Sequence, residues 1–175
     1  PGKAPESARG NRPLTDVFEP GSTSKVITLA AALEEKVVDP LTRVTVPNRL
    51  ERADRRFRDA EEHGVEQLTA AGVLAKSSNI GTIMLGEKVA PATMERYMRA
   101  FGLGAKTGVG LPESAGILAP ASQWNGSQRY TVLFGQGLSV NALQAAQVFS
   151  TIANDGVRMP PSVVAGFTAP DGTYR

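Results

Sequence analysis

The chain has 175 residues, of which 41% are apolar, and its formal net charge is +2. This length suits one domain with a real core, and so small a charge, carried by scattered basic side chains, argues against a nucleic-acid partner. The absence of cysteine excludes disulfides and thiolate metal sites, and no apolar run approaches the ~20 residues that a membrane-spanning helix needs.

The first predicted helix begins at the segment Pro20-Gly21-Ser22-Thr23-Ser24 and runs through Lys25 to Leu33, before Asp39-Pro40. Apolar residues occupy most of its faces, which predicts a central, buried position. Ser22 and Lys25 are three residues apart, so they share one face of the helix. Lys25 could therefore take the proton of the Ser22 hydroxyl, which is how a serine nucleophile is activated without a histidine.

A predicted strand and a charged cluster come next. Val44 to Val46 forms a short strand candidate, whereas residues 49–62 mix arginines with acids and are interpreted as a solvated loop or helix face. The one histidine of the chain, His63, follows them. We expect a solvated loop histidine there; a metal ligand beside Glu61 and Glu62 is the alternative.

Two further helices are predicted around a polar interruption. One begins after Thr69, a suitable N-cap, and the other covers residues 80–89. The interruption, Lys76-Ser77-Ser78-Asn79, could simply end one helix and cap the next through Asn79. Alternatively, the Ser77 hydroxyl passes a proton while the Asn79 amide holds a substrate carbonyl or a lysine amine.

The last third of the chain contains two predicted helices and two loops. The helices cover residues 93–101 and 143–153, and the glycine-rich residues 102–110 between them are predicted to form a loop. Residues 160–175 alternate weakly and include a hairpin-turn dipeptide, Asp171-Gly172.

Ser-x-x-Lys at Ser22 followed by Ser-x-Asn at Ser77 resembles the first two motifs of penicillin-binding proteins and serine β-lactamases. The flanking segments are similar to those of class B penicillin-binding proteins, the peptidoglycan D,D-transpeptidases of division and elongation, and lean towards the division (septal) type. These segments are residues 11–23, 77–81, 101–104, 107–113, 134–140 and 153–156.

The resemblance implies an α/β fold of the penicillin-binding transpeptidase and serine β-lactamase kind. Residues 1–175 would be a partial transpeptidase domain, mostly its helical subdomain, with the main antiparallel sheet largely missing. The family's third motif is a Lys-Thr-Gly strand that comes after the fifth predicted helix. Because Lys106-Thr107-Gly108 precedes that helix and lies in the glycine-rich loop, we interpret it as linker and expect the true triplet beyond Arg175.

The resemblance also implies four catalytic residues, Ser22, Lys25, Ser77 and Asn79, of which Ser22, Ser77 and Asn79 would bind substrate. Ser22 would form an acyl-enzyme with a stem peptide ending in D-Ala-D-Ala, or with a β-lactam. Lys25 must be neutral to act as the base, and we expect burial to lower its pKa from about 10.4. No cofactor or metal ion is implied.

For the full-length protein, the resemblance implies a membrane anchor, an extracytoplasmic catalytic domain and divisome membrane proteins as partners. The fragment alone would be inactive or weakly active. Two alternatives stay open: a β-lactamase or β-lactam sensor, which would share the serine and lysine, and a truncated, non-catalytic scaffold of the division machinery.

Overall fold

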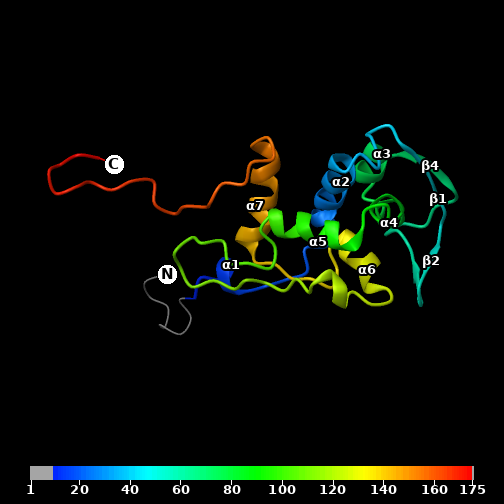
Figure 1. The fold of residues 1–175 in the computed structure, drawn as a ribbon, viewed down its shortest axis with the longest axis horizontal. Helices are drawn as coiled ribbons and strands as arrows, with labels where there is room; N and C mark the ends of the chain where they lie inside the picture. Colours follow the sequence, from blue (N-terminus) through cyan, green and yellow to red (C-terminus); the bar gives the residue numbers. More distant parts are fainter. Residues whose placement is uncertain (1–9, 175) are drawn as a thin grey trace.

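A computed structural model describes residues 10–174, in which helices predominate and strands are few (Figure 1). The α-helices are α1 (Arg12–Thr15), α2 (Lys25–Glu34), α3 (Ala70–Ala75), α4 (Asn79–Gly86), α5 (Pro91–Ala100), α6 (Gln128–Thr131) and α7 (Ala142–Ala153). Short 3₁₀ turns are η2 (Gly21–Ser24), η3 (Ala121–Gln123) and η4 (Val132–Phe134). The strands are β1 (Arg43–Val46), β2 (Leu50–Arg52), β3 (Arg55–Phe57) and β4 (Glu66–Thr69).

Helix α2 lies in the core, as its apolar pattern predicts. Ile27 and Ala31 are fully buried, and the helix packs against α4 and α5. Helix α4 approaches α2 closely because Gly86 has no side chain: a β-carbon there would lie 2.6 Å from Thr28 Cγ2. The C-terminal end of α4 therefore packs directly against the first turn of α2, which follows Ser22 and begins with Lys25.

The strands form two small antiparallel sheets. β1 pairs with β4, with Val44 opposite Leu68 and Val46 opposite Glu66. β2 pairs with β3 in a hairpin inside residues 49–62, so the interpretation of that cluster as a solvated loop or helix face was wrong. The hairpin forms because Phe57 is buried against the rings of Tyr130 and Phe134, each 6.1 Å away between centroids.

The predicted helices are confirmed, with small shifts at their ends. Thr69 caps α3 by accepting a hydrogen bond from Gly72 N–H at 3.0 Å. The first residue of α4 is Asn79, and its N-cap is Ser78, so the expectation that Asn79 caps this helix was wrong. Ser78 is the cap because its backbone is extended while that of Asn79 is already helical, and the Ser78 hydroxyl accepts a hydrogen bond from Gly81 N–H at 2.8 Å.

The segment Lys106-Thr107-Gly108 lies in a loop, as expected. The Glu113 carboxylate accepts hydrogen bonds from the amides of Thr107 and Gly108 at 2.8 and 2.9 Å. Buried Gln144 of α7 fixes the ends of this loop by donating to the carbonyls of Ala105 and Ala115, each at 2.8 Å. The triplet is therefore not part of a strand.

Beyond α7 the chain leaves the body of the molecule as an extended arm, residues 157–174 (Figure 1). The arm makes a turn at Asp171-Gly172 with a single bridge between Thr168 and Tyr174. Arg175, the last residue of the segment predicted to alternate, lies outside the described residues. Within residues 10–174, no helix has the length and apolarity needed to cross a bilayer.

Candidate active site

Ser22 lies in the 3₁₀ turn η2, which continues directly into α2. Gly21 fixes this turn by donating its N–H to the Gly135 carbonyl at 2.9 Å. Gly135 must be glycine, because its φ is +83° and a β-carbon would lie 2.1 Å from the Gly21 oxygen. The turn is thus held from the segment after η4, while the Ser22 side chain stays exposed.

Lys25 is the first residue of α2 and is completely buried. Its Nζ donates to the Ser77 hydroxyl at 3.0 Å and to the Ser77 carbonyl. Burial lowers the pKa of Lys25 from 10.5 to about 8, against the opposing effect of the Asp59 charge. The direction agrees with the expectation for a lysine that acts as a base near neutral pH.

Ser77 has an unusual backbone conformation for a serine, with φ at +55°. It ends α3 in a Schellman motif, because Ser77 N–H donates to the Leu74 carbonyl and Ser78 N–H to that of Val73, both at 3.0 Å. Glycine is the common residue at such a position, and a serine there is strained. This conformation turns the Ser77 hydroxyl towards Lys25.

Asn79 follows at the start of α4, and its Nδ2 donates to the Arg58 carbonyl at 3.1 Å. Ser22, Ser77 and Asn79 line one cleft of about 360 Å³, together with Lys76 and residues 59–63 and 66. Lys25 lies beneath it, bonded to Ser77. The structure therefore brings together the four residues that the sequence singles out.

Two expected contacts do not form. Among residues 10–174, Lys25 Nζ makes no hydrogen bond to Ser22 Oγ, and Asn79 makes none to Lys25. Both hydrogen bonds of Lys25 Nζ go to Ser77 instead. Catalytic hydrogen bonds are often long before substrate binds, so the roles of Ser22 and Asn79 stay predictions.

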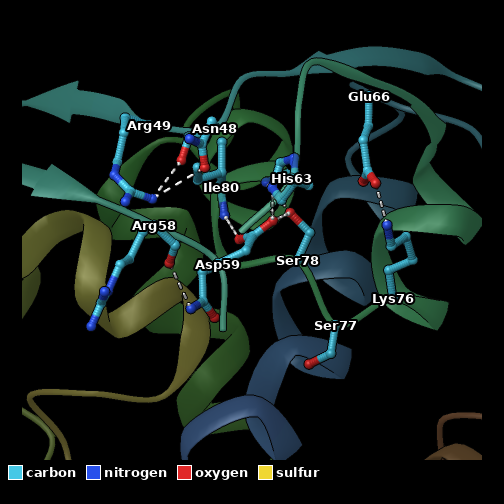
Figure 2. Close-up of polar contacts among 12 residues, drawn as sticks. Asn48, Arg49, Arg58, Asp59, His63, Glu66, Lys76, Ser77, Ser78 and Ile80 are labelled. Carbon is cyan, nitrogen blue, oxygen red and sulfur yellow. Dashed lines mark hydrogen bonds and ion pairs between the residues drawn. The ribbon is translucent and has the colours of Figure 1, made fainter. Parts of the chain in front are cut away.

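His63 is not the solvated histidine that the sequence predicts, because only 12% of its side chain is exposed. Its Nε2 lies 3.1 Å from Asp59 Oδ2 (Figure 2). Within the described part of the chain, no three His, Asp or Glu side chains are grouped to hold a metal ion. The sequence does not single out Asp59 as a site residue, because its hydrogen-bond partners Ser78 and Ile80 lie 19 and 21 residues away along the chain.

The family is decided by comparison with known proteins. The sequence model of one protein family, the penicillin binding protein transpeptidase domain, matches residues 2–173 of this chain. The chain belongs to this family. Penicillin-binding protein PbpB of Mycolicibacterium smegmatis is 44% identical over 173 residues, which cover 98% of this chain and 27% of PbpB. Peptidoglycan D,D-transpeptidase FtsI of Escherichia coli is 38% identical over 162 residues, 91% of this chain and 27% of FtsI.

Solved structures of the family have the same fold. Penicillin-binding protein 3 of Mycobacterium tuberculosis, complexed with aztreonam, matches with a TM-score of 0.90 and 43% identity over 95% of this chain and 37% of that one. The transpeptidase domain of Burkholderia pseudomallei penicillin-binding protein 3 matches with a TM-score of 0.83 and 36% identity. The match covers 94% of this chain and 49% of that one. The resemblance to division-type class B penicillin-binding proteins, and the fold class it implied, are confirmed. The chain spans 27% of the length of PbpB and of FtsI.

Proposed function

We propose that this chain is the part of a peptidoglycan D,D-transpeptidase domain that carries the nucleophile, its base and the second motif. The observation that supports this most is Lys25, buried, with a pKa lowered to about 8 and bonded to Ser77 beside the cleft that Ser22 lines. The third motif, Lys-Thr-Gly, would belong to a strand outside residues 1–175.

In the proposed reaction, Ser22 Oγ attacks the carbonyl between the two terminal D-alanines of a stem peptide. Neutral Lys25 accepts the serine proton, and the Ser77 hydroxyl relays a proton to the amine of the departing D-alanine. Asn79 holds the substrate amide, and the Ser22 N–H contributes to the oxyanion hole. An amine of a neighbouring stem then attacks the ester, which forms the crosslink and releases Ser22.

β-Lactams would react at the same serine. Attack of Ser22 Oγ on the lactam carbonyl opens the ring, and the ring nitrogen receives the proton, so the adduct retains the whole mass of the drug. Support comes from the aztreonam complex of the similar M. tuberculosis protein. Divisome membrane proteins as partners, and a membrane anchor that leaves the domain outside the cytoplasm, are part of the same proposal, which rests on membership of the family.

The test measures D-alanine release and crosslinked product from a D-Ala-D-Ala stem peptide with the complete domain. Ser22→Ala should abolish both, and Lys25→Met or Ser77→Ala should lower the rate by about 10²- to 10⁴-fold. Lys88→Met, which changes an exposed lysine outside the cleft, is the control. Rapid turnover of penicillin would instead support a β-lactamase, and a wild-type domain that releases no D-alanine would support a scaffold.

A further inference from the structure

We propose that Asp59 and His63, on the loop between β3 and β4, form a hydrogen-bonded positioning pair that holds the segment Ser77-Ser78-Asn79 in its reactive geometry. The inference rests on the transpeptidase function proposed above. Neither residue would touch substrate in this role; both act through the motif that they hold.

Asp59 and its neighbour Arg58 bind three successive residues of α4 and its cap (Figure 2). Asp59 Oδ2 accepts from Ser78 Oγ at 2.7 Å, and Asp59 Oδ1 accepts from Ile80 N–H at 2.9 Å. The Arg58 carbonyl accepts from Asn79 between them, at 3.1 Å. The loop therefore holds the segment from one side, while Lys25 holds Ser77 from the other.

The directions of these hydrogen bonds show how the pair is connected to the motif. Ser78 Oγ accepts from Gly81 N–H at 2.8 Å, so its own hydrogen points to Asp59. Both Asp59 oxygens are thus acceptors, as in a carboxylate. His63 Nε2 faces Asp59 at 3.1 Å and Nδ1 faces the Gly64 carbonyl at 2.6 Å. Because Asp59 Oδ2 is an acceptor, the tautomer that joins the pair carries hydrogen on Nε2.

Little of the pair meets solvent, since 12% of the His63 side chain and 11% of the Asp59 side chain are exposed. Removing one partner of a shielded pair leaves the other charge without compensation. Several other charges face it. Lys25 approaches from α2, and the same cleft holds Lys76 and the glutamates of the β3–β4 loop and β4. The glutamates are Glu61, Glu62 and Glu66. Glu62 pairs with Arg49, and Glu66 pairs with Lys76.

Asp59 has two effects that mutation can separate: its charge acts on Lys25, and its hydrogen bonds position the motif. The Asp59 charge raises the pKa of Lys25, so Asp59→Asn should lower that pKa and move the rise of the acylation rate with pH to lower pH. The same variant loosens the motif and lowers the plateau rate. Ser78→Ala removes one of the two hydrogen bonds that Asp59 accepts from the segment but keeps the Asp59 charge, so the plateau should fall while the pH midpoint stays.

The experiment measures the second-order rate constant of acylation by benzylpenicillin against pH in the complete domain. Asp59→Asn and His63→Phe should lower the plateau about 10- to 100-fold, as expected when a catalytic group is misplaced. Asp54→Asn, an equivalent change at an exposed position of the β2–β3 turn, should leave rate and midpoint unchanged. Melting temperatures identify any variant that has simply unfolded.

A second measurement does not depend on the variants folding. In the ¹⁵N-labelled wild-type domain, His63 Nε2 should carry the hydrogen that joins it to Asp59. A His63 Nε2 without hydrogen, or an Asp59→Asn variant with unchanged plateau and midpoint, would overturn the proposal. A wild-type domain that is not acylated at all would instead refute the transpeptidase function.

Discussion

At the scale of single residues, the site depends on two unfavourable placements. Lys25 is a buried amine and Ser77 a serine in the left-handed region, and each destabilises the fold by itself. The hydrogen bonds between them offset part of that energy. Unfavourable placements of this kind are typical of a functional site, which agrees with the roles that we propose for both residues.

The buried lysine predicts a particular pH dependence of stability. Because the pKa of Lys25 falls from 10.5 to about 8 on folding, the unfolded chain binds more protons between these values. The penalty for burying Lys25 is therefore largest below pH 8 and disappears as the pH rises towards 10.5.

Relative to Lys25→Met, the wild-type domain should gain about 2 kcal/mol of unfolding free energy between pH 7 and pH 10. Urea denaturation of both proteins at the two pH values measures this. Parallel changes in the two proteins would mean that Lys25 is already solvated, contrary to its burial.

The strain at Ser77 predicts that two variants differ in stability although both lose activity. Ser77→Gly should be more stable than Ser77→Ala by about 1 kcal/mol, because glycine accepts a positive φ and alanine does not. Both variants lack the hydroxyl, so acylation should be slow in both. Thermal melts and penicillin acylation check the two halves; a Ser77→Gly variant that is less stable than Ser77→Ala would contradict the assignment.

At the scale of elements, two helix N-termini form the site. α2 carries Lys25 and α4 carries Asn79, and the two helices pack closely where the glycine at position 86 meets Thr28. Gly86→Ala should destabilise the domain by about 2 kcal/mol, since its methyl group would meet Thr28 and Leu133. Denaturation of this variant beside Gly64→Ala, where an added methyl group meets nothing within 4 Å, tests the packing.

The sequence predicts long elements better than short ones. The helices have a periodic apolar pattern, and Thr69 and Asn141 mark the starts of α3 and α7. The β2–β3 hairpin and β4 escaped prediction because they are only three or four residues long and depend on distant partners, as Phe57 does on Tyr130. Similarly, the two motifs identify the four candidate residues from the sequence. Asp59 belongs to no motif, so its role becomes visible only in the folded structure.

At the scale of the whole molecule, residues from two of the family's three motifs line the cleft. The chain covers 27% of PbpB, and its arm carries exposed apolar side chains away from the body (Figure 1). They include Val157, Met159, Val163, Val164 and Phe167.

The central claim is that Ser22 is a nucleophile activated by Lys25. Intact-mass and peptide-mapping mass spectrometry after incubation with benzylpenicillin test it most directly, on the complete domain and its Ser22→Ala variant. We predict one adduct with the full mass of the drug, located on the peptide that contains Ser22 and absent from the variant. An adduct that persists in Ser22→Ala, or a wild-type domain that stays unmodified, would contradict the account.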